Sequence, residues 1–300
     1  MNLTKQLTAL HADNPLFEDK TATDWLCDVT ALTWYLKKQP EQNWLLFEHD
    51  IQHFATLLFA LLCAQKHVIL PPSEQTGQLL AIKPNVDATI GHAPIEDLRH
   101  LPTATALAIP IGGPDPALLI DNSQTIDFYT SGSTGESKKI TKSWSQLGNE
   151  ISDLDALWGE QINNTLIVAT VSHQHIYGFL FKLIWPLLCG RHIYGKMISY
   201  PEELVMQLQQ PVTLISSPAF LARTCQEPLW QAYADSLRTV FSSGGPLNLA
   251  TATAMAQHLG QPPIEVLGST ETGGIGWRQQ TKPDGHLWQS FITVNIRIEA

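Results

Sequence analysis

Short apolar runs alternate with longer amphipathic segments through most of this 300-residue chain. Within residues 21–38, Trp25, Val29, Leu32 and Leu36 recur at helical spacing, which predicts a helix with one buried face. The compact apolar runs between such segments are typical of strands that are buried on both faces. The hydrophobic pattern therefore predicts a mixed α/β protein.

The next part of the chain predicts a β-α-β unit. Residues 44–47 form a short apolar strand, Asp50 caps an apolar helix that runs to about residue 65, and residues 67–70 form a second strand that stops at Pro71. The alternation continues with a short helix at residues 78–81 and with strands at residues 87–90 and 105–109.

The alternation resumes after residue 125. Strands are predicted at residues 126–129 and 139–141, and Ser143 with Gln146 has the Ser-x-x-Gln form of a capping box at the start of a helix that reaches Trp158. The remaining elements are strands at residues 165–170, 192–194, 212–215, 237–241 and 264–267, and helices at residues 177–188, at residues 202–209 and before Gly260.

This order of elements predicts α/β architecture with mostly parallel sheets. The Pro/Gly-rich stretch from Pro110 to Pro116 is the clearest linker, so we expect a first subdomain over residues 1–112 and a second over residues 113–284. Beyond Gly285 only strand patterns remain, and they predict the start of a β-rich subdomain over residues 285–300. The alternating residues are Ile292, Val294, Ile296 and Ile298.

One loop concentrates groups that hold a polyphosphate. Between Phe128 and Lys139, six hydroxyl-bearing side chains, two glycines and two lysines fall within twelve residues. Glycines let backbone amides turn toward an anion, hydroxyls donate to phosphate oxygens, and a lysine supplies positive charge. A serine-rich turn that binds nothing has a similar composition, so composition alone leaves both interpretations open.

The flanking elements decide which kind of phosphate loop this can be. Strands are predicted on both sides of it, whereas the loop of P-loop NTPases leads from a strand directly into a helix. No Gly-Lys-Ser/Thr follows a glycine at the Walker spacing either. Two later loops, residues 242–247 and 268–274, also follow predicted strands. Because ligands in open α/β sheets lie at the carboxyl ends of strands, we expect these loops to share one crevice.

Charge and composition exclude several classes of partner. The formal net charge of −10 would repel nucleic acid and anionic membranes, so basic contacts must be local, as at Lys138 and Lys139. The apolar run at residues 54–64 is too short to span a bilayer, and the run at residues 176–189 contains Lys182 and Pro186. We expect no membrane insertion.

The cysteines and the first residues bear on the compartment. Residues 1–17 lack the basic start and apolar core of a signal peptide. The cysteines are widely spread, which fits thiols in a reducing compartment better than a disulfide framework or a zinc site. We therefore expect a cytoplasmic protein. The cysteines are Cys27, Cys63, Cys189 and Cys225.

Four separated motifs resemble the adenylate-forming (AMP-binding) enzymes, which include acyl-CoA synthetases, peptide-synthetase adenylation domains and luciferases. They are Tyr129–Gly135 with Lys138, His175–Gly178 followed by Trp185-Pro186-Leu187 and Gly190, Gly244–Leu247, and Gly268–Glu271. They stand in the family's order, each at a predicted strand or loop boundary, over most of residues 40–300. One motif alone would be weak evidence, whereas four in register are strong.

The resemblance implies the fold of the large N-terminal domain of these enzymes, with two layered α/β subdomains. It also implies their chemistry: a carboxylate attacks the α-phosphate of ATP to give acyl-AMP and pyrophosphate, and a thiol of CoA or of phosphopantetheine on an acyl-carrier protein then takes the acyl group. The implied cofactors are ATP and Mg²⁺, and the implied substrate is a small carboxylic acid.

Residue roles follow from the same resemblance. The phosphate loop would surround the β- and γ-phosphates, Lys138 would add charge, Thr270 would contact the α-phosphate, and Glu271 would ligate Mg²⁺, as a hard oxygen ligand suits a hard cation. His175 would lie at the mouth of the acyl site. The implied nucleotide-binding residues are Thr130, Ser131, Gly132, Ser133, Thr134, Gly135, Ser243, Gly244, Gly245, Leu267, Gly268 and Ser269.

Each role has a structural alternative. Glu271 also fits a solvated loop carboxylate, His175 a hydrogen-bonded core histidine, and Gly244 with Gly245 a tight turn before a helix. His173 and His175 form a His-x-His pair, but no third ligand for zinc stands near them in the sequence.

The chain also departs from the family's pattern. Ser137 replaces the usual loop proline, and Leu267 replaces the aromatic residue that stacks on adenine, which puts nucleotide affinity in doubt. The family's ribose-binding Asp, hinge and catalytic lysine lie downstream of these motifs, so we expect the chain to be incomplete for full catalysis.

Two rival functions stay open, and so does the substrate. A non-catalytic nucleotide-binding or carrier-docking module could use the same pocket, and a phosphotransferase could use the same loop. The sequence does not specify the acid, although the pocket segments contain no Asp to pair with a substrate ammonium. That absence favours an acid without an amino group.

Overall fold

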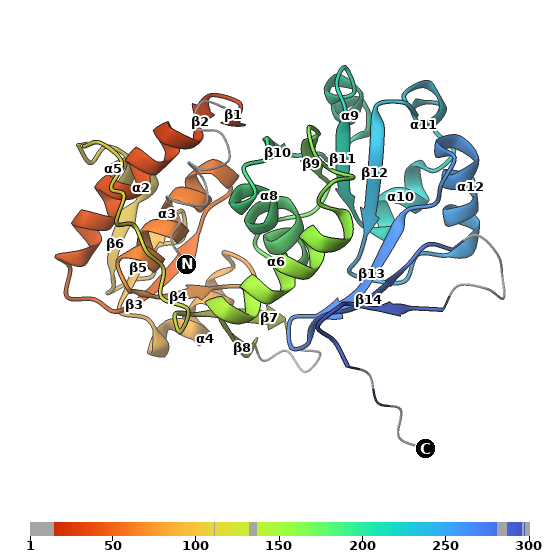
Figure 1. Cartoon of the computed structure of the whole chain (residues 1–300). Helices are drawn as coiled ribbons and strands as arrows, with labels where there is room; N and C mark the ends of the chain where they lie inside the picture. Colours follow the sequence, from red (N-terminus) through yellow and green to blue (C-terminus); the bar gives the residue numbers. More distant parts are fainter. Residues whose placement is uncertain (1–14, 111, 132–136, 281–286, 296, 298–300) are drawn as a thin grey trace. The chain divides into compact units, whose positions relative to one another are not determined.

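The computed structural model describes residues 15–110, 112–131, 137–280, 287–295 and 297. The chain divides into two compact units (Figure 1). The first comprises Met1–Gly148 with Leu187–Gly190, and the second comprises Asn149–Pro186 with Arg191–Ala300. The units are described one after the other.

The first unit is built on a six-stranded sheet in the order β6-β5-β3-β4-β7-β8. Neighbouring strands are parallel except for β7 and β8, which form an antiparallel hairpin. The strands are β3 (Asn43–Phe47), β4 (His67–Leu70), β5 (Ala88–Gly91), β6 (Arg99–Pro102), β7 (Thr125–Ser131) and β8 (Ser137–Ser143). A two-stranded ribbon of β1 (Pro15–Phe17) and β2 (Lys20–Thr21) precedes them.

Two long helices supply most of the apolar packing in this unit. Helix α2 (Ala22–Lys37) starts with a capping box between Thr21 and Asp24, and α3 (Ile51–Cys63) is capped by Asp50. Helix α3 is apolar on nearly all sides and is buried, as its composition requires. Shorter helices are α4 (Thr76–Ile82), the 3₁₀ turn η1 (Lys83–Asn85) and α5 (Thr103–Leu107).

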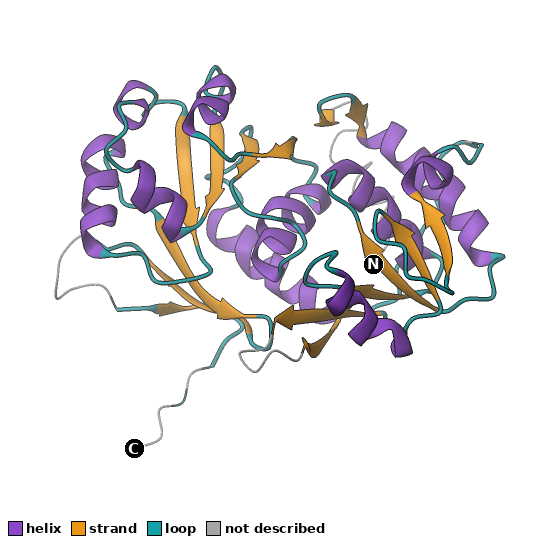
Figure 2. Ribbon diagram, turned by 180° about the vertical axis from the view of Figure 1, so that it is seen from behind, coloured by secondary structure: helices purple, strands orange, loops and turns teal. Residues whose placement is uncertain are grey.

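The second unit contains a seven-stranded sheet in the order β10-β9-β11-β12-β13-β14-β15. The strands from β10 to β13 are parallel, and β14 and β15 continue the sheet antiparallel. The strands are β9 (Leu166–Ala169), β10 (Ile193–Met197), β11 (Val212–Ser216), β12 (Leu237–Ser242), β13 (Ile264–Ser269), β14 (Gly273–Arg278) and β15 (Gln289–Ser290). Figure 2 distinguishes these strands from the helices by colour.

Helices pack on both faces of this sheet. On one face the ring of Phe241 lies 5.1 Å from that of Trp158 and 5.2 Å from that of Phe181. On the other face Val240 joins an apolar cluster with Met255. The helical segments are α6 (Trp144–Trp158), α7 (Ile176–Gly178), the π-helical η2 (Phe179–Ile184), α8 (Trp185–Leu188), α9 (Pro201–Gln207), α10 (Pro218–Thr224), α11 (Leu229–Ala232) and α12 (Leu249–Leu259).

Most predicted elements are confirmed. The capping box at the start of α6 is formed, because the Gln146 amide donates to Ser143 Oγ and the Ser143 amide donates to Gln146 Oε1. Helix α12 ends at Gly260, which has a positive φ of 76°. The prediction of α/β architecture with mostly parallel sheets is confirmed.

Two predicted strands are wrong. Residues 103–107 form α5 rather than a strand at 105–109, because this short segment packs against α2 and α3. Near the C-terminus, Ile292 and Thr293 lie in a turn, and both the amide and the hydroxyl of Thr293 donate to Asp153. Among the described residues from Ile292 onward, the alternating apolar pattern therefore forms no strand. Strands β6 and β14 were not predicted.

The division into units differs from the predicted boundary at residues 112 and 113. Strand β7 pairs with β4, so the hairpin of β7 and β8 completes the first sheet. The division falls instead within α6, between Gly148 and Asn149. The Pro/Gly-rich stretch connects two parts of the first unit. Strand β15 extends the sheet of the second unit.

An ion pair inside the second unit gives a stability prediction. Arg278 donates from Nε and Nη2 to the two carboxylate oxygens of the buried Glu265, at 3.0 and 3.1 Å. We expect Arg278→Ala to lower the free energy of unfolding by about 3 kcal/mol, because it leaves a buried carboxylate without its cation. Urea denaturation measures this change. The matched control Arg238→Ala removes an exposed arginine, and an equal loss in both variants would contradict the assignment.

Candidate functional site

Hydroxyl groups gather at the carboxyl ends of the parallel strands in the second unit. Thr170 Oγ1 lies 3.0 Å from Ser216 Oγ, which joins the ends of β9 and β11. The Ser243 amide donates to Ser216 O, and Ser243 Oγ donates to Val266 O at 2.9 Å. These bonds tie four neighbouring strand ends into one polar edge, where a ligand of an open α/β sheet is expected.

The turn after β12 leaves open space beside its backbone. Ser243 is buried, and its hydroxyl group donates a hydrogen bond to β13. Gly244 has a φ of +87°, and no atom lies within 4 Å of the position that a Cβ would occupy there. Asn248 then caps α12 by accepting a hydrogen bond from the Thr251 amide at 2.7 Å. A flat group can approach the backbone at Gly244 without meeting a side chain from the turn.

The second turn, between β13 and β14, is held by its own side chains. The Ser269 amide donates to Thr272 Oγ1, and the Thr272 amide donates to Ser269 Oγ, both at 3.2 Å. Thr270 is half-buried and Glu271 is exposed between these anchors. The side chain of Leu267 is 42% exposed at the end of β13 and presents an aliphatic surface.

Strand pairing brings these two turns together. In the parallel pair β12–β13, Phe241 is opposite Ile264 and Ser242 is opposite Glu265, so both strands end at the same edge of the sheet. The predicted residues Ser243, Gly244, Gly245, Leu267, Gly268, Ser269, Thr270 and Glu271 all lie on these neighbouring strand ends.

His175 stands at the start of α7, on the segment that follows β9. Gly178 allows this segment to fold back, because a Cβ at residue 178 would lie 2.0 Å from Ser172 O. The imidazole keeps more than a third of its surface accessible, while the surrounding protein partly desolvates it and lowers its pKa. A neutral imidazole can accept or donate one hydrogen bond without adding charge.

The phosphate loop belongs to the first unit. Thr130 on β7 is paired with Lys138 on β8, and Ser131, opposite Ser137, ends β7. Gly132, Ser133, Thr134 and Gly135 lie outside the described residues.

The two adjacent lysines of the hairpin face opposite ways, as successive residues of a strand do. Lys139 Nζ lies 3.4 Å from the buried carboxylate of Asp127, which also contacts His67 at 2.8 Å and accepts from Thr141 at 2.6 Å. Lys138 is exposed and lies on the other face. Both lysine side chains are exposed.

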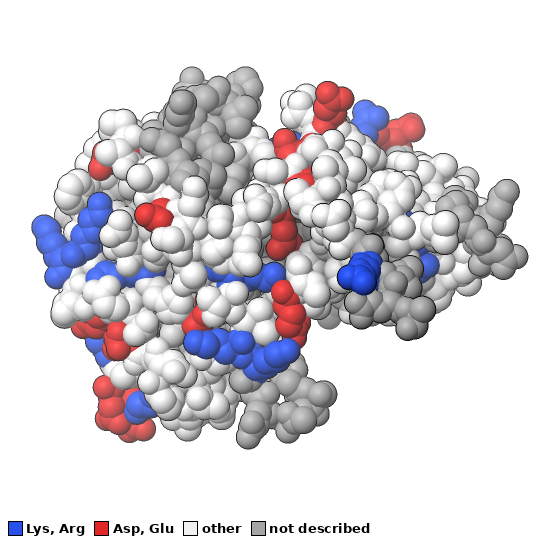
Figure 3. Space-filling model, turned by 60° about the horizontal axis from the view of Figure 1, so that its bottom comes forward, with Lys and Arg blue, Asp and Glu red and all other residues white. Residues whose placement is uncertain are grey.

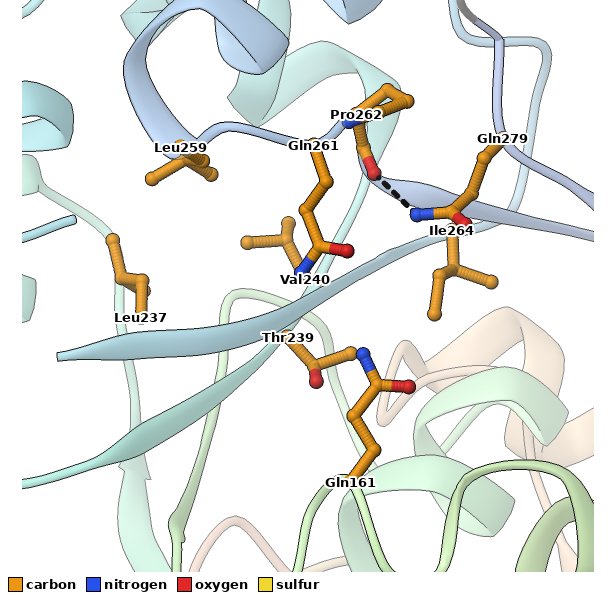
Figure 4. A pocket seen from close by; sticks show the side chains of 9 residues that line it. All are labelled: Gln161, Leu237, Thr239, Val240, Leu259, Gln261, Pro262, Ile264 and Gln279. Atoms are coloured by element: carbon orange, nitrogen blue, oxygen red, sulfur yellow. Dashed lines mark hydrogen bonds between the residues drawn. The ribbon is translucent and has the colours of Figure 1, made fainter. Parts of the chain in front are cut away.

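A small cavity at the opposite ends of β12 and β13 can be set aside (Figure 4). It encloses about 10 Å³ between Gln161, Thr239 and Ile264. That volume holds about one water molecule, far below the several hundred Å³ of a small-molecule site.

Three further features of the described residues bear on other kinds of site. On the face drawn in Figure 3, basic side chains stand close to acidic ones. No helix among the described residues is long and apolar enough to cross a membrane. The described residues also contain no group of three or more His, Cys, Asp or Glu side chains that could hold a metal ion.

A known protein family matches the part of the chain that carries these segments. The profile of the AMP-binding enzyme family matches residues 126–294, which is more than half of the chain and includes the hairpin, the His175 segment and both turns. The chain belongs to the AMP-binding enzyme family.

Curated relatives include 4-coumarate–CoA ligases of two bacteria. The ligase of Rhodobacter capsulatus is 30% identical over 165 residues, which cover 54% of this chain and 42% of the relative. The ligase of Cereibacter sphaeroides is 28% identical over 177 residues, 54% of this chain and 41% of the relative. The matched part thus spans less than half the length of these relatives.

Solved structures of the family share the fold. ATP-bound MatB from Rhodopseudomonas palustris superposes with a TM-score of 0.77 at 18% identity, over 95% of this chain and 62% of that one. o-Succinylbenzoate CoA synthetase from Bacillus subtilis gives a TM-score of 0.78 at 15% identity, over 92% and 60%. An N-terminal subdomain of Klebsiella oxytoca NpsA gives a TM-score of 0.76 at 12% identity, over 93% and 74%. The described fold is that of the N-terminal part of adenylate-forming enzymes.

The structure adds residues that the sequence did not single out. Thr170 directly follows β9 and Ser216 is the last residue of β11, so both are hydroxyl residues at the carboxyl end of a strand, and this signal could have revealed them. Asp127 is a charged residue between the apolar Ile126 and Phe128 of β7, which is also a signal for a buried interaction.

Asp127 gives a pH-dependent stability prediction. Burial acts to raise the pKa of its carboxyl, but hydrogen bonds from His67 and Thr141 outweigh that effect and hold the pKa below the ordinary value of 3.8. The unfolded chain therefore binds the proton more readily, so this stabilisation is present above about pH 4 and is lost as pH falls through the folded-state pKa. We expect Asp127→Asn to cost about 1–3 kcal/mol at pH 7. The difference between the two proteins should shrink toward pH 3 in denaturant titrations, and a constant difference would contradict this account.

His175 gives a second prediction. Because partial desolvation lowers its pKa, we expect its ring proton signals to titrate with a midpoint below the ordinary 6.5 in NMR spectra. The variant His175→Gln lacks these ring signals, so comparison of its spectrum with that of the unaltered protein assigns them to His175. A midpoint at or above 6.5 would show that desolvation does not control this ring.

Proposed function

We propose that this chain binds ATP with Mg²⁺ and forms part of an enzyme that activates a carboxylic acid as acyl-AMP. The acyl group would then pass to the thiol of CoA or of phosphopantetheine on an acyl-carrier protein. The observation that supports the proposal is the pair of turns on the neighbouring strands β12 and β13. Their sequences resemble the adenine turn and the Gly-x-Thr-Glu element of the adenylate-forming enzymes.

The residues present fit an adenine nucleotide. Gly244 leaves open space beside its backbone, and the exposed side chain of Leu267 provides an apolar surface at the same sheet edge. Leu267 offers an aliphatic contact instead of a stacked ring, so we expect weaker adenine binding than with an aromatic residue. The Thr270 hydroxyl, held between the anchors Ser269 and Thr272, can donate to an α-phosphate oxygen.

The residues also fit Mg²⁺ rather than a metal held in an all-protein cage. Glu271 supplies one carboxylate in an exposed turn, and Mg²⁺ in nucleotide sites needs only one or two carboxylates because phosphates and water complete its shell. The bound ion would neutralise charge on the polyphosphate during its transfer.

The proposed reaction conserves atoms and charge in two steps. An oxygen of the substrate carboxylate bonds to the α-phosphorus while the bond to pyrophosphate breaks. The thiol then loses its proton to solvent, and its sulfur bonds to the acyl carbon while the bond from that carbon to AMP breaks. Lys138 would stabilise the leaving pyrophosphate, and Thr270 the α-phosphate. Partial desolvation lowers the pKa of His175 and favours the neutral ring. The ring would therefore line the entrance of the acyl site without placing a positive charge beside the substrate carboxylate.

We further propose that the protein works in a reducing compartment such as the cytoplasm. No disulfide bond joins its cysteines, all of which are described, and burial raises the pKa of the Cys63 thiol to about 12, which keeps it inert.

Two variants test the metal ligand. We expect Glu271→Ala to reduce the affinity of the 300-residue chain for ATP about tenfold or more in the presence of Mg²⁺ and to leave the melting temperature nearly unchanged, because the residue lies in an exposed turn. Isothermal titration with ATP and Mg²⁺ measures the affinity. Glu227→Ala, another exposed carboxylate, serves as the control. Equal affinity in all three proteins would exclude Glu271 as the ligand.

The adjacent lysines make a matched pair. Lys138→Ala should weaken ATP binding by about tenfold or more, because a charge-assisted contact to phosphate is lost. Lys139→Ala should mainly lower stability, since Lys139 is paired with Asp127. The opposite order of effects in ATP titrations would assign the phosphate contact to Lys139.

The product separates this activity from that of a phosphotransferase. With the natural full-length protein and a panel of carboxylic acids, we expect AMP and pyrophosphate. Formation of ADP would indicate phosphoryl transfer instead, and ATP binding without any turnover across the panel would favour a non-catalytic nucleotide-binding or carrier-docking module.

A further inference from the structure

A carboxylate on α6 holds the turn that carries Thr270 and Glu271. Glu150 Oε2 accepts a hydrogen bond from the Gly274 amide at 3.0 Å. Gly274 is the second residue of β14 and is opposite Gly268, next to Gly273, which is opposite Ser269. The register of β13 and β14 shifts between Leu267 and Gly268, so the ladder is irregular at this point and a side chain from outside the sheet supplies an acceptor.

The neighbouring glycine shows how closely Glu150 approaches. Gly273 has a φ of +71°, and a Cβ at this residue would lie 2.4 Å from Glu150 Oε1. A side chain at residue 273 would therefore displace the carboxylate and also strain the backbone. The fit between Gly273 and Glu150 fixes where β14 leaves the turn.

The turn has two independent supports as a result. Ser269 and Thr272 close it from inside by reciprocal hydrogen bonds, and Glu150 anchors its C-terminal end from the helix. The two residues with proposed roles, Thr270 and Glu271, stand between these supports. The local bonds fix the shape of the turn, and the Glu150 contact links its C-terminal end to α6.

We propose that Glu150 is a positioning residue for Thr270 and Glu271. This inference rests on the proposed function, because it assigns Glu150 to the same nucleotide and magnesium site. Glu150 acts through the Gly274 amide and not by contact with the ligand. The hydrogen-bond acceptor is the group required, so Glu150→Gln, which retains a side-chain oxygen, should preserve the function that Glu150→Ala loses.

The first test measures the turn without any ligand. Hydrogen exchange followed by NMR should show faster exchange of the Gly274 amide in Glu150→Ala than in the unaltered chain, by about tenfold or more, and near-normal exchange in Glu150→Gln. The exposed residue Glu160, in the turn that follows α6, provides the control variant, Glu160→Ala. Unchanged exchange of Gly274 in Glu150→Ala would overturn the inference whether or not the chain binds a nucleotide.

The second test measures the consequence for binding. ATP affinity is determined by titration with and without Mg²⁺ for the same variants. When Mg²⁺ is present, we expect Glu150→Ala to bind ATP about tenfold more weakly than the unaltered chain. When Mg²⁺ is absent, the two affinities should be nearly equal. Glu150→Gln should bind ATP like the unaltered chain in both conditions. A purely structural role would instead lower thermal stability and leave the Mg²⁺ dependence intact, which would overturn the inference. If the unaltered chain does not bind ATP with Mg²⁺, the proposed function fails, and hydrogen exchange still decides the role of Glu150 in holding the turn.

Discussion

The pairing of β12 with β13 is the constraint on which the candidate site depends. Their parallel register, with Phe241 opposite Ile264, makes both strands end at one edge of the sheet, so two segments more than twenty residues apart become neighbours. Burial of Phe241 among aromatic rings and the hydrogen bond from Ser243 Oγ to Val266 O hold this register. A shift of one residue would exchange the faces of the sheet and break both interactions.

On this fixed base the site combines rigid anchors with open backbone. Hydrogen bonds from Ser243 to Val266 and from Gly274 to Glu150 hold the turns at their roots. Beyond the roots, Gly244 leaves space and Glu271 remains exposed. The arrangement suits a ligand whose charges and planar ring must be held in a set geometry, since the protein orders its own groups before the ligand arrives.

The long helices and strands, and the segments proposed for the site, could be predicted from the sequence because each has a local cause. Apolar spacing and the caps at Thr21, Asp50 and Ser143 specify helices, and short apolar runs specify buried strands. The failures have tertiary causes. The glycine-rich strand β14 forms only because it pairs with β13, and α5 forms against α2 and α3 despite its β-branched threonines. The role of Glu150 could not be predicted, because it depends on a contact 124 residues away along the chain.

The most direct test of the central claim is the backbone amide NMR spectrum of the 300-residue chain titrated with a non-hydrolysable ATP analogue and Mg²⁺. The account predicts saturable chemical-shift changes in residues 243–245 and 268–271, with smaller changes at the amino ends of β12 and β13. Saturation with no change in those two turns, or changes confined to another surface, would contradict it.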